Sequence, residues 1–165
     1  MRTLIIDALC NKESRSAARE LKKKNPDTDT IETAGMKISP CVGCGSCWLK
    51  TPGVCSIHDD YEEILKSILK HDKIVLIGGT ALGFIDYRLK NIVDRILPIV
   101  TMMVYIVDGQ ERHVPRYDKR FQIALLYDGD GEKEYLNRWM ERFALNFNSK
   151  SLGAYPLNKY EEAAI

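Results

Sequence analysis

The sequence has no excess of positive charge, because 24 Lys and Arg residues face 23 Asp and Glu residues in a chain of 165. A nucleic-acid-binding protein usually carries a concentrated basic surface, so this balance argues against that class of function. No apolar run is long enough to cross a bilayer. The N-terminus reaches Asp7 too early for the apolar core of a signal peptide. We therefore expect a cytoplasmic protein with no membrane contact.

Other familiar signatures are missing as well. The chain has no internal repeat, no low-complexity segment and no G-x-G-x-x-G dinucleotide fingerprint. Its three histidines, His58, His71 and His113, share no spacing with one another or with a carboxylate pair, so none is assigned to catalysis. A length of 165 residues, 45% of them hydrophobic, predicts one domain over residues 1–165 with a proper core.

Short apolar runs alternate with helical patterns along the chain. The runs that predict strands cover residues 3–9, 28–34, 73–79, 121–127 and 151–155. Helices are predicted over about 15–24, 61–69, 89–97 and 136–144. This alternation predicts an α/β fold with a doubly wound parallel sheet.

An insertion at about residues 100–117 interrupts the alternation. Asp108-Gly109 in its middle predicts a hairpin turn. An apolar hairpin beside a sheet is typical of a partner contact, and the tail after Pro156 is too short for a full closing helix. A second subunit is an economical cover for the exposed sheet, so we expect a homodimer or homotetramer.

Four of the five cysteines lie in a loop predicted over residues 37–58. Without a secretion signal, such thiols usually hold metal or move electrons. The spacing C-x₂-C-x₂-C-x₇-C favours an iron–sulfur cluster over structural zinc, and free thiols are a further alternative. A disulfide that cycles between Cys44 and Cys47 is another. Cys10 stands apart and is expected to be a small buried residue.

Three loops follow predicted strands, and in an open parallel sheet ligands bind beyond the carboxyl ends of the strands. The loop at residues 10–16 offers polar side chains and a helix start, which suits a phosphate, although Ser14 could simply cap the helix. The loop at 78–84 has three glycines, which let backbone approach a flat ring or merely form a turn. The loop at 128–131 either borders the same cleft or ends its strand.

From Pro40 to Arg95, about a third of the chain, the sequence resembles the flavodoxin-fold NADPH-dependent FMN reductase family, and most of all its iron–sulfur flavoprotein branch. The matching motifs, in order, are Cys41-x-x-Cys44-x-x-Cys47, Gly53-x-Cys55, Asp59-Asp60, Ile74-Val-Leu-Ile-Gly-Gly-Thr80 and Leu89-Lys90-x-x-x-Asp94-Arg95. Two loops depart from the usual family sequences. Ala8-Leu9-Cys10-Asn11 stands in place of Gly-Ser-Pro-Arg, and Gly79-Thr80-Ala81 stands in place of Pro-x-Tyr.

The resemblance implies a flavodoxin-like five-stranded sheet of order 2-1-3-4-5, with FMN at its carboxyl edge and an oligomer that completes the flavin site. It places around the FMN phosphate Asn11, Ser14, Arg15 and Ser16. Along the isoalloxazine it places Gly79, Thr80, Ala81, Leu82 and Gly83, and we add Asp128 at the border. It assigns as ligands of a [4Fe–4S] cluster Cys41, Cys44, Cys47 and Cys55.

The sequence thus predicts an FMN-binding oxidoreductase that takes electrons from NAD(P)H or a ferredoxin-type donor, with the cluster as a relay. No acid–base residue is assigned, because the redox chemistry belongs to the cofactor. The alternative is a non-catalytic flavodoxin-fold binding or regulatory module with zinc or free thiols at the cysteine loop.

Overall fold

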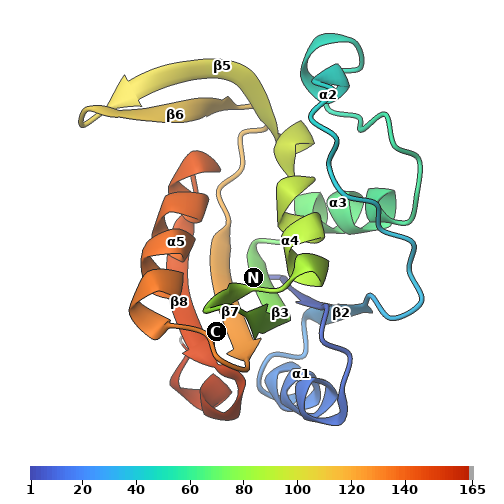
Figure 1. Ribbon diagram of the computed structural model, residues 1–165, viewed down its shortest axis with the longest axis vertical. Coiled ribbons are helices and arrows are strands. Elements are labelled where there is room, and N and C mark those ends of the chain that lie inside the picture. Colours follow the sequence, from blue (N-terminus) through green and yellow to red (C-terminus); the bar gives the residue numbers. More distant parts are fainter. Residues whose placement is uncertain (164–165) are drawn as a thin grey trace.

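In the computed structural model, which describes residues 1–163, five parallel strands form the centre of the protein in the spatial order β2-β1-β3-β7-β8 (Figure 1). The strands are β1 (Thr3–Asp7), β2 (Thr28–Glu32), β3 (Lys73–Ala81), β7 (Gln122–Asp128) and β8 (Lys150–Pro156). All four neighbouring pairs are parallel. Counted along the chain, this is the predicted order 2-1-3-4-5, and the flavodoxin-like fold is confirmed.

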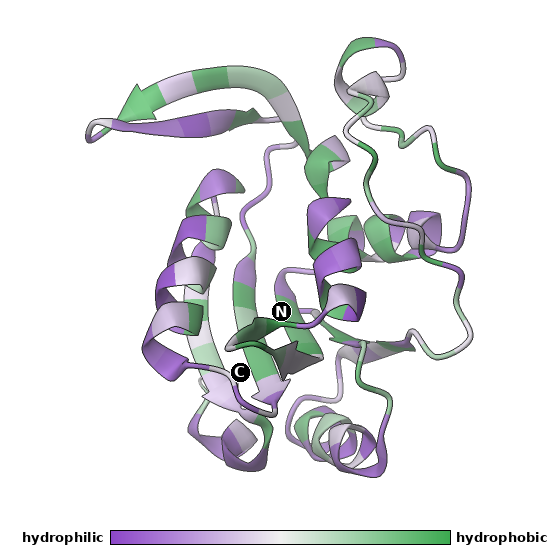
Figure 2. Cartoon of the chain, in the orientation of Figure 1, coloured by the Kyte–Doolittle hydropathy of each residue, from purple (hydrophilic) through white to green (hydrophobic). Residues whose placement is uncertain are grey.

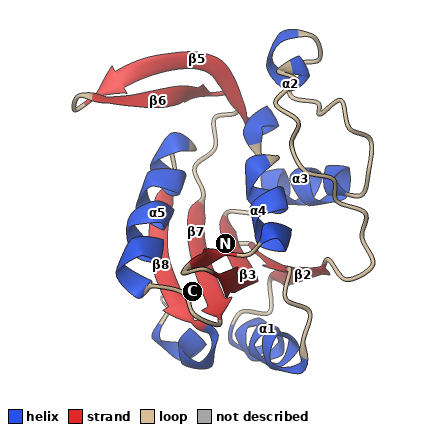
Figure 3. Ribbon diagram, in the orientation of Figure 1, coloured by secondary structure: helices blue, strands red, loops and turns tan. Residues whose placement is uncertain are grey.

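Helices cover both faces of the sheet, as Figure 3 shows. They are α1 (Lys12–Lys24), α3 (Tyr61–Lys70), α4 (Tyr87–Asp94) and α5 (Lys133–Asn146). Alternate residues of β1 serve the two faces, since Leu4 and Ile6 pack into the cluster with α3, α4 and α5, whereas Ile5 packs with α1. Strands buried on both faces read as continuous apolar runs, which explains the pattern of β1 and β3.

The tail after β8 forms a short 3-10 helix, η2 (Leu157–Glu162), rather than a full helix. Leu157 is buried beside α1 and so helps to cover this face of the sheet. The predicted helix over residues 89–97 is α4 followed by the 3-10 turn η1 (Leu97–Ile99), with Pro98 at the break. None of the helices within residues 1–163 is long and apolar enough to span a bilayer.

The predicted insertion is an antiparallel hairpin, β5 (Val100–Val107) and β6 (Gln110–Pro115), which projects from the sheet (Figure 1). Asp108 and Gly109 form its turn with positive φ angles of 51° and 72°. Figure 2 shows apolar residues along β5 and polar residues along β6. Met103 is 68% exposed and Ile106 is 73% exposed, so β5 presents an apolar surface to solvent.

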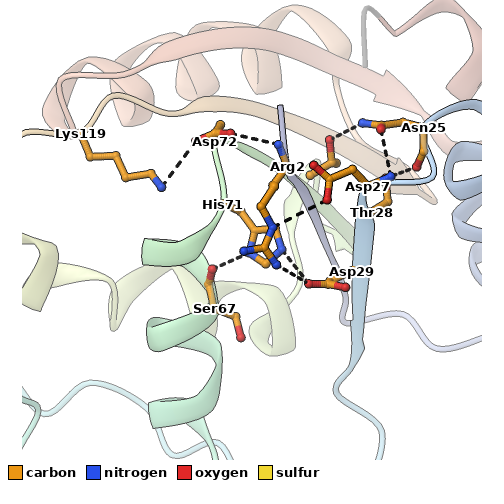
Figure 4. A network of polar contacts seen from close by, with 10 residues as sticks. Arg2, Asn25, Asp27, Thr28, Asp29, Ser67, His71, Asp72 and Lys119 are labelled. Atoms are coloured by element: carbon orange, nitrogen blue, oxygen red, sulfur yellow. Dashed lines mark hydrogen bonds and ion pairs between the residues drawn. The ribbon is translucent and has the colours of Figure 1, made fainter.

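A polar network joins the amino ends of the central strands (Figure 4). The imidazole of His71 is buried, with Nε2 3.0 Å from Asp29 Oδ2 and Nδ1 2.7 Å from the Ser67 carbonyl oxygen. The Arg2 amide donates to Asp72. Ligands of open α/β sheets bind at the opposite, carboxyl edge, so we expect this network to stabilise the fold.

The cysteine-rich segment lies between β2 and α3 as a long excursion from the sheet (Figure 3). It contains one short helix, α2 (Ser46–Leu49), which the sequence did not predict. Gly45 precedes this helix with a φ of 66°, a left-handed conformation that suits glycine.

Candidate functional site

The three predicted loops come together at the carboxyl edge of the sheet. The register places Asp7 at the end of β1 beside Ile77, and Gly79 of β3 beside Asp128 of β7. The Thr80 hydroxyl donates a hydrogen bond of 3.1 Å to the Asp128 carbonyl oxygen. The edge expected to bind a ligand is therefore formed by residues from distant parts of the sequence, from Asp7 to Asp128.

The loop after β1 begins α1 with a complete capping box. The Asn11 Oδ1 accepts a 2.8 Å hydrogen bond from the Ser14 amide, and the Ser14 Oγ accepts one of 3.1 Å from the Asn11 amide. Arg15 Nε donates to Glu32 at 2.9 Å, and this hydrogen bond raises the pKa of Arg15. Ser16 is exposed. The helix starts at Lys12 rather than at about residue 15 because Asn11 caps it.

Asp7 is the centre of this loop, and sequence reasoning missed it. Its side chain is fully buried. Oδ1 accepts from the amides of Leu9 (3.0 Å) and Cys10 (2.8 Å), and Oδ2 accepts from the Ser14 hydroxyl at 2.7 Å. Cys10, which was expected to be buried, is half-buried. It adopts a φ of 54°, and its thiol donates to the Asp7 carbonyl oxygen at 2.9 Å. An acid that ends an otherwise apolar run was the signal available in the sequence.

The glycine loop divides into two parts. A Cβ at Gly78 would lie 2.6 Å from a methyl group of Leu89, and one at Gly79 would lie 2.9 Å from Asp86 Oδ2. These two glycines allow α4 to pack closely on β3. Residues 80–83 form the tip of a small hairpin between β3 and β4 (Phe84–Ile85), with Leu82 fully exposed. The placement of these residues along a flavin ring remains a prediction.

A cleft of about 430 Å³ opens beside these loops, between the segment after β1, the segment after β2 and the first turn of α4. Its walls include Ala8, Cys10, Met36, Ile38, Tyr87 and Arg88. This volume and the mixture of apolar and polar groups are typical of small-molecule sites. The apolar wall residues suit an aromatic ring, whereas three donors of the loop after β1 are already bonded to Asp7, which disfavours a phosphate at that position.

The four cysteines of the loop remain free thiols in the described part of the chain, with Cys41 and Cys44 exposed and Cys47 and Cys55 half-buried. Burial, followed by the charges of the other three cysteines of the loop, raises the pKa of Cys47. Hydrogen bonds from Ser46 and then Ser56 lower the pKa of Cys44 to about 7. Among residues 1–163, no three Cys, His, Asp or Glu side chains form a ready metal site. Four thiols on one loop are chemically the right donors for a cluster, and the ligand set remains a prediction.

A buried arginine holds this loop to the sheet domain. Arg95, the residue after α4, donates through Nη1 to both oxygens of Asp59 (2.7 and 2.6 Å) and to the Ser39 carbonyl oxygen (3.1 Å). Its Nη2 donates to the Ile57 carbonyl oxygen at 3.0 Å and lies 3.5 Å from Cys55 Sγ. The guanidinium also lies 4.5 Å from the centre of the Tyr61 ring. Both ends of the cysteine loop are thereby fixed to one side chain.

Helix α4 therefore connects the two candidate sites. Its first turn lines the cleft through Tyr87 and Arg88, and the residue that follows its last turn, Arg95, contacts the cysteine loop. The indole N–H of Trp48 in α2 adds a second tie by donating to the Leu97 carbonyl oxygen at 3.0 Å. The Asp59-Asp60 and Asp94-Arg95 motifs were noted in the sequence, but the contact between Asp59 and Arg95 was not predicted.

This arrangement is that of a flavodoxin-like α/β protein with a cysteine loop attached at one side. Solved structures share the architecture. An NAD(P)H:quinone oxidoreductase from Methanothermobacter marburgensis matches with a TM-score of 0.62 and 11% identity, over 94% of this chain and 85% of that chain. General stress protein 14 from Treponema denticola, solved in complex with FMN, matches with a TM-score of 0.54 and 17% identity, over 98% and 92%. At these identities the likeness concerns the fold.

Sequence comparison adds a more specific resemblance. An iron–sulfur flavoprotein from Methanocaldococcus jannaschii is 34% identical over 85 residues, which are 52% of this chain and 43% of that protein. An iron–sulfur flavoprotein from Archaeoglobus fulgidus is 35% identical over 78 residues, 47% of this chain and 37% of that protein. The matched segment thus spans less than half the length of these relatives. No protein-family model matches the chain. The resemblance to iron–sulfur flavoproteins drawn from the motifs is confirmed.

Proposed function

We propose that this protein is a flavin-dependent oxidoreductase that passes electrons between a flavin at the carboxyl edge of the sheet and the cysteine loop. The observation that carries the proposal is the course of α4. This helix starts at a cleft of suitable volume, and the residue that follows it, Arg95, contacts Cys55 and both ends of the loop. The curated relatives that share this segment are named iron–sulfur flavoproteins, which supports the same pairing of sites.

The residues of the chain have separate tasks in this proposal. The walls of the cleft hold the ring and keep water from one of its faces, while residues 79–83 and Asp128 lie at the neighbouring loops. The bound flavin supplies hydride and single-electron chemistry. Cys41, Cys44, Cys47 and Cys55 would hold a [4Fe–4S] cluster, which supplies single-electron transfer.

The electron donor and the assembly state belong to the proposal as well. Structural neighbours that use NAD(P)H support a nicotinamide donor, and a cluster suits exchange with a ferredoxin-type protein. The exposed apolar side chains of β5 support a homodimer or homotetramer. A cytoplasmic location would keep the thiols reduced.

A second candidate function has an observation of its own. The hydrogen bonds that Asp7 makes with the loop after β1 favour a flavodoxin-fold module without turnover, in which the cysteine loop would hold zinc or keep free thiols. Such a protein would be colourless and would contain zinc or no metal.

The visible spectrum of anaerobically purified protein separates the two functions, with iron, zinc and acid-labile sulfide assayed on the same sample. We expect two flavin bands after addition of flavin, with broad additional absorbance where iron and sulfide are present. Replacing Cys44 and Cys47 together by serine should remove the broad absorbance and leave the flavin bands. Colourless protein that takes up neither FMN nor riboflavin would contradict the proposal.

A further inference from the structure

We infer that Asp7 excludes the flavin phosphate from the loop after β1, so that the protein selects its flavin by the ring and ribityl chain and gains no affinity from a 5′-phosphate. This inference rests on the proposed function, and it concerns which flavin the same site takes. It assigns a specificity role to Asp7, which lies outside the motifs that match the iron–sulfur flavoproteins.

Three donors beside the position that the resemblance gives the phosphate are already bonded. A helix start binds an anion through free backbone N–H groups and neighbouring hydroxyls. Here the amides of Leu9 and Cys10 point at Asp7 Oδ1 from 3.0 and 2.8 Å, and the Ser14 hydroxyl points at Oδ2 from 2.7 Å. The carboxylate of the chain itself therefore stands where an anionic ligand would be bound.

The carboxylate is held firmly in that position. Asp7 and Ser14 are both fully buried, so rotation of the Asp7 side chain would leave buried donors without an acceptor. The backbone of Asp7 is held as well, because its carbonyl oxygen accepts hydrogen bonds from the Cys10 thiol at 2.9 Å and the Thr33 amide at 2.9 Å. A phosphate cannot displace the carboxylate without breaking this set of contacts.

The arginine of this loop already has an acidic partner. Within residues 1–163, Asp7 forms no ion pair. Arg15, the cation that the family resemblance places near the phosphate, is bonded to Glu32 at 2.9 Å. A phosphate placed beside Asp7 would meet a like charge in a buried setting, where such charges repel strongly.

The test compares FMN with riboflavin, which differ by the phosphate alone, through quenching of flavin fluorescence by the full-length protein. For the wild type we expect the two dissociation constants to agree within about threefold, or riboflavin to bind more tightly. Asp7→Ser frees the three donors and removes the charge, so it should tighten FMN binding by about tenfold or more and leave riboflavin unchanged.

Two further variants keep the test decisive. Asp7→Asn removes the charge and retains an acceptor for the Leu9 and Cys10 amides, and it should also favour FMN over riboflavin if the serine variant fails to fold. Glu13→Gln removes an exposed carboxylate from the first turn of the same helix and should change neither constant. Circular dichroism checks the fold of each protein.

The outcomes for the inference and for the proposed function differ. Wild-type protein that binds FMN about tenfold or more tightly than riboflavin would overturn the inference and leave the flavin proposal standing. Asp7 variants that fold and show no gain for FMN would overturn it too. Binding of neither flavin by the wild type or by any variant would overturn the proposed function itself.

Discussion

Replacing Arg95 by methionine tests how the cysteine loop is fixed to the sheet domain. The side chains of Arg95 and Asp59 are 1% and 2% exposed, so they form a buried ion pair. Methionine fills much of the same space, but it removes five polar contacts to Asp59, Ser39, Ile57 and Cys55. Asp59 would then stay buried without its cation.

The expected cost follows from this burial. Removing one partner of a buried pair typically destabilises a protein by about 3–5 kcal/mol, because the remaining charge is uncompensated. Among the described residues, Arg95 Nε has no hydrogen-bond partner, and its loss relieves one unfavourable feature. We therefore expect about 3 kcal/mol, which corresponds to a fall in Tm of about 6–12 °C for a chain of this length.

The effect should depend on pH with a definite sign. Burial raises the pKa of Asp59, but hydrogen bonds from Arg95 and from the amides of Ser39 and Tyr61 lower it further than burial raises it. A carboxyl whose pKa is lowered in the folded state stabilises the fold above its unfolded pKa of about 3.9 and loses this contribution as the pH falls through the folded value. The difference between wild type and Arg95→Met should thus be largest near neutral pH and shrink in acid.

Urea unfolding at neutral pH and at about pH 2.5, followed by circular dichroism, measures both effects. The matched control is Lys90→Met on the same helix, because Lys90 pairs with Asp94 at the surface with both side chains more than 40% exposed. That variant should cost about 0.5 kcal/mol or less. An Arg95→Met protein within about 1 kcal/mol of wild type, or a difference that grows in acid, would refute the reasoning.

Two further predictions concern the glycine loop and the cysteine loop. Gly78→Ala should lower the free energy of unfolding in urea by about 1–3 kcal/mol, because the new Cβ would lie 2.6 Å from Leu89. The loss should be smaller in a Leu89→Ala background, where the clashing side chain is absent. If the effects of the two substitutions simply add, the clash is not the cause. In metal-free protein, the rate of alkylation of Cys44 should rise with pH, with a midpoint at about 7, and then level off. Ser46→Ala should move the midpoint of this pH profile upward, because the hydrogen bond from Ser46 lowers the pKa of Cys44. An unchanged midpoint would show that Ser46 does not set the pKa of Cys44.

Much of the fold could be predicted from local patterns. Continuous apolar runs marked β1, β3 and β7, because strands buried on both faces have no polar side, and Asp108-Gly109 marked the hairpin turn. The expected strand over 151–155 is β8, and the expected insertion is β5 and β6. The short helix α2 was missed because four residues carry too little periodicity to be seen.

The candidate site was predictable only in outline. The cysteine spacing and the resemblance indicated redox chemistry and the sheet edge at which it would occur. The sequence by itself could not show that Arg95 meets Asp59, which is 36 positions earlier, because that contact depends on how α4 packs across β3.

The sequence by itself determined the order of strands and helices and the presence of four thiols on one loop, because these depend on the spacing of residue types along a short stretch of chain. The tertiary structure decided what surrounds each candidate group. It turned the carboxylate of Asp7 back onto the amides of its own loop, and it brought Arg95 to both ends of the cysteine loop. A buried polar side chain needs a hydrogen-bond partner, and the packing of the helices on the sheet decides which partners lie within its reach.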